Sequence, residues 1–123
     1  PNNTRIPRHG IGIKAPAGTE VRAVAAGLVA VSERPERSTY LATVILDHGG
    51  GYYTIYASMR DGLVKKGDRV VRGQVIGHVG GETTDEGAHL HFEIRGQGGI
   101  PLDPANWLRS PSARPSSRTR LPR

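Results

Sequence analysis

The sequence predicts an all-β domain, a compact antiparallel sheet or β-hairpin sandwich with little helix. Short apolar or alternating segments recur along residues 10–108, and glycine-rich turns separate them. The chain has 17 glycines among its 123 residues, which is typical of a protein with many tight turns. Strands this short and this closely spaced favour a small antiparallel β structure.

Eight strands are predicted, each a short run that ends at a turn signal. They are Gly10–Lys14, Glu20–Val24, Gly27–Ser32, Ala42–Asp47, Tyr52–Ala57, Arg69–Val71, Val75–His78 and His89–Ile94. One short helix is predicted at Asp103–Trp107, with Asp103 as its N-cap and Pro104 in its first position.

The formal net charge of +6 is concentrated at the end of the chain. Five arginines and no acid lie in residues 109–123, whereas residues 1–108 are almost balanced in charge. We therefore expect one β domain at 1–109 and a disordered basic Ser/Pro/Arg tail at 110–123. A folded part without a basic, aromatic-rich patch argues against nucleic-acid binding.

Cysteine and long apolar runs are both absent from the sequence, and each absence excludes a class of site or segment. The chain has no cysteine, which excludes disulfides, cysteine zinc sites and a cysteine nucleophile. No apolar run is long enough for a transmembrane segment, and the first residues lack the pattern of a signal peptide.

His89 and His91 form the one local histidine pair. Residues i and i+2 of a strand share a face, so both imidazoles point the same way. This arrangement suits zinc or a ligand–base pair, and a plain polar strand face is the alternative. Zinc needs a third ligand from another strand, and the spacing leaves it open. The candidates are His9, Asp47, His48 and His78.

Residues 8–108 resemble the LytM or lysostaphin-type zinc metallopeptidase domain, which cuts peptidoglycan cross-bridges. The matching segments follow one another in the order of that family. They are residues 10–21, Asp47-His48-Gly49-Gly50-Gly51-Tyr52, Thr54-Ile55-Tyr56-Ala57, residues 64–70, residues 73–77, Gly87-Ala88-His89-Leu90-His91-Phe92-Glu93-Ile94 and Pro101-Leu102-Asp103-Pro104.

The resemblance implies that the catalytic machinery is incomplete. Active members carry His-x-Gly-x-Asp, and here Arg8 and Gly12 stand at the zinc-binding His and Asp positions. They also carry Tyr-x-His, where the histidine assists catalysis, and here Ser58 stands in its place. His89 matches a catalytic histidine and His91 a zinc ligand. We therefore expect no bound cofactor, and a former active-site groove that serves as a binding surface. Its expected residues are Arg8, Gly12, Tyr56, Ser58, His89 and His91, with core packing as the alternative for Tyr56.

This pattern of loss resembles the murein hydrolase activators of the EnvC and NlpD type. It implies a non-catalytic partner of a cell-wall amidase, located in the bacterial periplasm or cell envelope, with peptidoglycan as a further ligand. An active zinc endopeptidase is the alternative. A lipoyl or biotin carrier is a third reading, but Lys65-Lys66 lacks the flanking residues of a carrier lysine.

Overall fold

The computed structural model describes residues 10–34 and 41–103, and these residues form nine β-strands. The strands are β1 (Ile11–Lys14), β2 (Glu20–Arg22), β3 (Gly27–Glu33), β4 (Ala42–Gly49), β5 (Tyr52–Gly62), β6 (Arg69–Val70), β7 (Val75–Val79), β8 (His89–Arg95) and β9 (Pro101–Leu102). The one helical element in this part of the chain is a 3₁₀ turn, η2 (Gln97–Gly99). No helix among the described residues is long and apolar enough to cross a bilayer.

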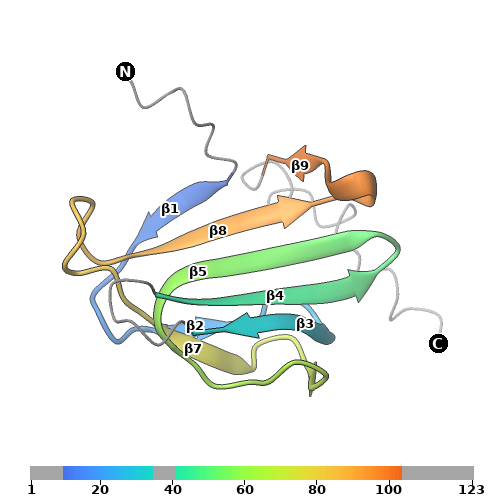
Figure 1. The fold of residues 1–123 in the computed structure, drawn as a ribbon, viewed down its shortest axis with the longest axis horizontal. Coiled ribbons are helices and arrows are strands. Elements are labelled where there is room, and N and C mark those ends of the chain that lie inside the picture. Colours follow the sequence, from blue (N-terminus) through green and yellow to red (C-terminus); the bar gives the residue numbers. More distant parts are fainter. Residues whose placement is uncertain (1–9, 35–40, 104–123) are drawn as a thin grey trace.

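All strand pairs are antiparallel, and they form one sheet in the order β1-β8-β5-β4-β3-β6 (Figure 1). β9 pairs with β8, whereas β2 pairs with β7 and β7 pairs with the second half of β5. β5 is therefore shared between the main layer and the small β2–β7 layer. The predicted all-β antiparallel class is confirmed, and the two layers belong to one continuous sheet.

The hydrophobic core lies between these two layers. Alternate residues of β4 and β8 point into it, because a strand presents successive side chains to opposite faces. Val21 of β2 and Ile76 of β7 meet Leu46 of β4 and Phe92 of β8 in one buried cluster. The opposite faces of β4, β5 and β8 form the outer face of the sheet, which carries the His-x-His pair.

β5 turns a corner at Ser58. Up to Ala57 the strand pairs with β8, and from Met59 onward it pairs with β7. Ser58 has a φ of 66°, and it is the one non-glycine residue with positive φ in the described part of the chain. This left-handed conformation is costly for a residue with a Cβ. The backbone therefore accepts local strain at the point where the sheet changes layer.

The eight predicted strands are confirmed. Most of their ends shift by no more than a few residues, and β5 extends further than predicted, to Gly62. β9 was not predicted, because a two-residue strand after a glycine-rich turn has no periodicity to detect. The predicted helix at Asp103–Trp107, except for Asp103 itself, and the predicted tail at 110–123 fall outside the described residues.

Candidate functional site

The register of the sheet brings β1, β8 and β5 together around His91. Gly12 of β1 is directly opposite His91, and Ala57 of β5 is opposite it on the other side. Residues directly opposite one another share a face, so Gly12, His91 and Ala57 all belong to the outer face. A Cβ added at Gly12 would have one neighbour within 4 Å, His89 Cδ2 at 4.0 Å. Position 12 therefore borders both histidines and has room for a side chain.

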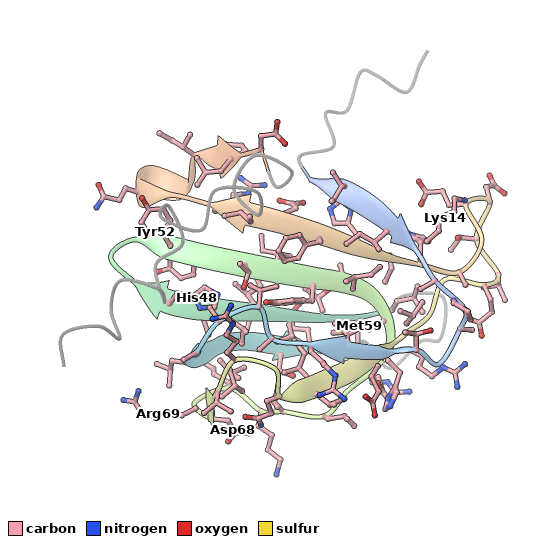
Figure 2. The ribbon with its side chains drawn as sticks, turned by 180° about the vertical axis from the view of Figure 1, so that it is seen from behind. Lys14, His48, Tyr52, Met59, Asp68 and Arg69 are labelled. Atoms are coloured by element: carbon pink, nitrogen blue, oxygen red, sulfur yellow. The ribbon has the colours of Figure 1, made fainter. Side chains whose placement is uncertain are left out.

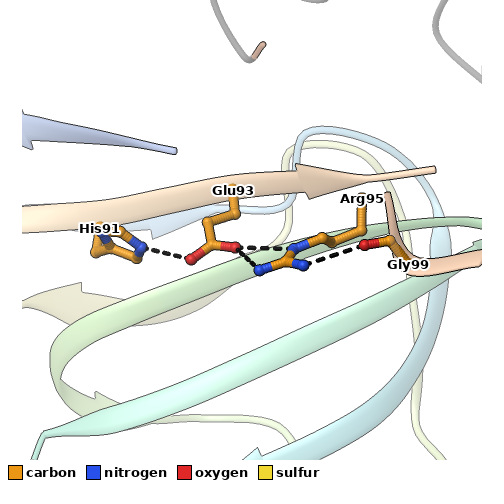
Figure 3. A network of polar contacts seen from close by, with 4 residues as sticks. All are labelled: His91, Glu93, Arg95 and Gly99. Atoms are coloured by element: carbon orange, nitrogen blue, oxygen red, sulfur yellow. Dashed lines mark hydrogen bonds and ion pairs between the residues drawn. The ribbon is translucent and has the colours of Figure 1, made fainter. Parts of the chain in front are cut away.

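His91 belongs to a chain of polar contacts along β8 (Figure 3). Its Nε2 lies 2.7 Å from Oε2 of Glu93, and Oε1 of Glu93 accepts two hydrogen bonds from Arg95, at 3.0 and 2.8 Å. Arg95 also donates to the Gly99 carbonyl at 3.1 Å. Burial raises the pKa of Glu93, but the hydrogen bonds and charges of His91 and Arg95 outweigh it and lower that pKa. Glu93 is therefore ionised and fixes both neighbours.

His89 lies at the start of β8 and is 4% exposed. Its Nδ1 donates to the Gly87 carbonyl at 2.7 Å, and its Nε2 lies 3.0 Å from a carboxylate oxygen of Glu86. Both partners come from the loop that precedes β8. The ring is therefore held on both sides by the chain itself.

Ser58 places its backbone, and no imidazole, beside this histidine. Its carbonyl accepts a hydrogen bond from the Gly80 amide at 3.0 Å, and Gly80 in turn forms a β-bridge with His89. A serine hydroxyl is not a general base near neutral pH. The corner of β5 therefore reaches the histidine pair without supplying a base.

The described residues do not offer a complete zinc site. A structural or catalytic zinc needs at least three protein ligands, and no group of three histidine, aspartate or glutamate side chains is arranged for a metal within 10–34 and 41–103. Asp47 lies on the outer face of β4, and His78 on β7 bonds to Asp61 at 2.9 Å. His48 lies in the core. Three of the candidate third ligands, Asp47, His48 and His78, therefore do not form a metal site with His89 and His91. His9 and Arg8 fall outside the described residues.

Tyr56 is a correction to the predicted groove. It is 1% exposed and faces the core, where its ring packs 5.5 Å from the ring of Phe92. Alternation along β5 places Tyr53, Ile55 and Ala57 on the outer face instead, opposite Arg95, Glu93 and His91. Tyr56 is therefore a core residue, as the alternative interpretation had it, and it offers almost no surface to a partner on the outer face.

Comparison of the sequence with models of protein families identifies the family of this domain. The model of peptidase family M23 matches residues 7–104.

The chain belongs to peptidase family M23.

The relatives of this M23 domain have more than one role. It is 34% identical to stage II sporulation protein Q of Bacillus subtilis over 89% of this chain and 39% of that protein. It is 37% identical to the peptidoglycan DD-endopeptidase ShyA of Vibrio cholerae over 72% of this chain and 20% of that protein. It is 36% identical to the murein hydrolase activator EnvC of Escherichia coli over 80% of this chain and 23% of that protein. The chain therefore spans about a fifth to two fifths of these relatives.

A solved structure shows the same architecture. Lysostaphin from Staphylococcus simulans superposes with a TM-score of 0.73 at 26% identity, covering 85% of this chain and 43% of that one. This M23 domain and lysostaphin therefore share one fold, and the LytM-type resemblance of the sequence is confirmed.

A buried polar chain in this M23 domain was not anticipated from the sequence. His48 on β4 lies 2.7 Å from the Ala26 carbonyl through Nδ1 and 2.6 Å from the Thr54 hydroxyl through Nε2. The hydroxyls of Thr54 and Tyr56 lie 2.9 Å apart, and the Val24 amide donates to Tyr56 at 3.1 Å. The sequence contains these residues within family-like motifs, but nothing in the motif spacing shows that the side chains meet.

The protonation state of His48 follows from its surroundings. Burial lowers the pKa of His48, although the Ala26 carbonyl and the Asp47 charge act in the opposite direction. In the neutral ring Nδ1 carries the proton donated to Ala26, so Nε2 accepts the Thr54 proton and Tyr56 donates to Thr54. Burial also raises the pKa of Tyr56 to about 12, so its phenol stays protonated. Every group of the chain is therefore satisfied.

We expect the stability of this M23 domain to fall in mild acid because of His48. The folded pKa is below the unfolded value of 6.5, so the unfolded state binds more protons between these two values. The free energy of unfolding should therefore be retained above pH 6.5 and should decrease as the pH falls below it, by at most about 1.4 kcal/mol per pH unit. Urea unfolding at pH 7.5 and 5.5 measures the effect. His48→Gln should be less stable at both pH values and should lose this part of the pH dependence. If the unaltered domain and the variant showed the same pH dependence of stability, that dependence would come from groups other than His48.

Proposed function

We propose that this chain is a non-catalytic M23 domain that activates a cell-wall N-acetylmuramoyl-L-alanine amidase in peptidoglycan remodelling and daughter-cell separation. The observation that carries the proposal is the register of β1 and β8, which sets Gly12 opposite His91. The position expected for a zinc-binding aspartate borders the histidine pair and has no side chain. Ser58, at the position of the assisting histidine, also supplies no base. The similarity to the murein hydrolase activator EnvC supports the same role.

The outer face suits protein binding. Val31, Ile45 and Ile55 are partly exposed and lie directly opposite one another on β3, β4 and β5. Glu93 continues this row on β8. Apolar side chains of a partner segment can be buried on this row, and the Glu93–Arg95 network at its end can orient the segment through polar contacts. We propose that the partner reaches this face from the side of His89 and His91 and that one of its carboxylates pairs with Arg8, which falls outside the described residues.

The wider setting follows from the same proposal. A domain that acts with a cell-wall amidase works in the periplasm or cell envelope of a bacterium, requires no cofactor of its own, and has peptidoglycan as a further ligand. We also propose the domain division 1–109 for the β domain and 110–123 for a basic tail, which rests on the sequence alone.

The competing function is a zinc-dependent peptidoglycan endopeptidase. The similarity to the DD-endopeptidase ShyA favours it, as does the retained pair His89 and His91. The structure shows no hydrogen bond at Nδ1 of His91 among the described residues, so this nitrogen is a suitable ligand atom. Zinc would still need two further ligands, which Gly12 and Arg8 do not provide.

Metal binding separates the two functions. We expect the purified chain to hold far less than one equivalent of zinc and to release no muropeptides from cell walls. Arg8→His combined with Gly12→Asp should raise zinc to about one equivalent, because two ligands join His91 and position 12 has space for a side chain. The same double variant with His91→Ala is the matched control and should lose the metal. Near-equimolar zinc in the unaltered chain, with cleavage that a chelator abolishes, would establish the endopeptidase instead.

The activator role needs a direct assay. A purified cell-wall amidase should degrade dye-labelled peptidoglycan faster when the chain is added, while the chain alone should release no dye. The chain should also bind the amidase in the absence of peptidoglycan. An amidase rate that is the same with and without the chain contradicts the proposal.

A further inference from the structure

The surface is hollowed at the opposite edge of the sheet from the histidine pair. A cavity of about 540 Å³ opens where β6 meets the ends of β3 and β4. Leu28, Val70 and Val71 form its apolar walls, and Arg69 and Asp47 are its charged members. Four steps across the sheet separate β6 from β8, which is about 19 Å at the usual strand spacing.

The hollow depends on small residues at the start of β3. A Cβ at Gly27 would come within 2.7 Å of the Asp47 carbonyl oxygen and 3.0 Å of His48 Nδ1. A residue with a side chain would clash with β4 there, so glycine allows β3 and β4 to pack closely beside the hollow. Leu28 is 36% exposed and Val71 is 65% exposed, so apolar surface stays open to solvent at the rim.

The segment around β6, which contributes Arg69 to the hollow, is strongly basic. Lys65, Lys66, Arg69 and Arg72 are exposed, and Asp68 is the one acid within residues 62–72. Asp68 accepts a hydrogen bond from the Lys65 amide at 2.9 Å and so belongs to the turn. Within the part of the chain that the structure describes, no hydrogen bond or ion pair engages the Arg69 guanidinium. Figure 2 shows Arg69 and Asp68 at this edge, far from Lys14 on β1.

The register fixes the order of the binding groups. Arg69 of β6 is opposite Leu28 of β3, and Leu28 is opposite Asp47 of β4. A cation, an aliphatic side chain and a carboxylate therefore follow one another across the outer face. Asp47 is partly satisfied, because its Oδ1 accepts the Gly49 amide at 2.9 Å. The free cation next to exposed aliphatic surface is the feature that selects a ligand.

We propose that this basic hollow binds an acidic amphipathic segment of a partner protein. An aliphatic side chain of the segment enters between Leu28 and Val71, and its glutamates or aspartates contact Arg69 and the neighbouring cations. Charge complementarity favours an acidic partner. The concave shape favours a protein segment over an anionic bilayer, because a protruding aliphatic side chain can enter the hollow, whereas a flat bilayer would only span its mouth. This surface is additional to the proposed amidase contact at the histidine pair and does not depend on it.

Direct binding to designed peptides tests the proposal. The probes are two fluorescent 15-residue amphipathic helices with identical leucine faces, one with glutamate and one with lysine on the polar face. The glutamate peptide should bind the chain in fluorescence anisotropy, and the lysine peptide should bind at least about 10-fold more weakly. Arg69→Glu should weaken the glutamate peptide about 10-fold, and Val71→Ser should weaken it several-fold. Neither exposed residue packs in the core, and circular dichroism checks the fold.

Lys14→Glu is the matched control, because it makes the same charge reversal at the opposite edge and should leave peptide affinity unchanged. His91→Ala should also leave it unchanged, which separates this surface from the proposed amidase contact. The proposal is overturned if the glutamate peptide does not bind, if both peptides bind equally, or if Arg69→Glu and Lys14→Glu have the same effect. Binding to anionic phosphatidylglycerol vesicles without binding to the glutamate peptide would assign the surface to membranes and overturn it too.

Discussion

Replacing Tyr56 with alanine should lower the free energy of unfolding by about 3–5 kcal/mol, which is the usual cost of removing a large buried aromatic side chain. The ring is 1% exposed and packs against Phe92, so its removal leaves a cavity between the two layers of the sheet. The hydroxyl also accepts the Val24 amide and bonds to Thr54, and both groups would lose a partner. Chemical denaturation measures the loss.

Tyr56→Phe separates packing from hydrogen bonding. It keeps the ring and removes the hydroxyl, so we expect a loss of about 1–2 kcal/mol, because the Val24 amide is left unpaired and Thr54 keeps only its bond to His48. A Tyr56→Ala protein with unaltered stability but impaired amidase binding would contradict the buried position and restore Tyr56 to the surface.

Arg8→Glu should weaken binding to the amidase by roughly 30- to 4,000-fold, the effect of breaking a desolvated charge pair worth about 2–5 kcal/mol. This follows from the proposed groove, in which Arg8 pairs with a partner carboxylate, although Arg8 itself falls outside the described residues. His89→Ala should have a much smaller effect on activation, because no chemistry depends on it. Amidase stimulation and direct cell-wall cleavage are measured for both variants.

An endopeptidase reverses this order. His89→Ala would then abolish cell-wall cleavage, and Arg8→Glu would be tolerated. Loss of all activity in His89→Ala alone, with Arg8→Glu active, would therefore contradict the activator proposal. Because His89 donates to Gly87 and faces Glu86, the fold of that variant must be checked by circular dichroism.

The strands and the His-x-His face were predictable because their signals are local. In β8, one alternate set is Leu90, Phe92 and Ile94, so the face that points into the core is unambiguous and the histidines must lie on the other. The family resemblance then correctly indicated the fold. The register that sets Gly12 against His91 follows from strand pairing between distant segments, which only the structure displays.

The side on which β5 is buried was not predictable in the same way. Both alternate sets of β5 contain apolar side chains, so alternation groups Tyr56 with Thr54 but does not show that this set faces the core. The decisive contacts come from His48 and Phe92, on two other strands. The cavity at β6 is equally non-local, since it depends on how residues 26–28, 47–49 and 69–71 meet.

The left-handed backbone at Ser58 separates the path of the main chain from the chemistry of the side chain. β5 has to turn there whichever side chain is present, because Ala57 is committed to His91 and Met59 to Val79. The turn at this position is therefore set by the pairing of β5 with its neighbours and not by the serine side chain. The corner therefore fixes the main chain near His89 and leaves the choice of side chain open, so the group presented there can be exchanged while the path of β5 stays the same.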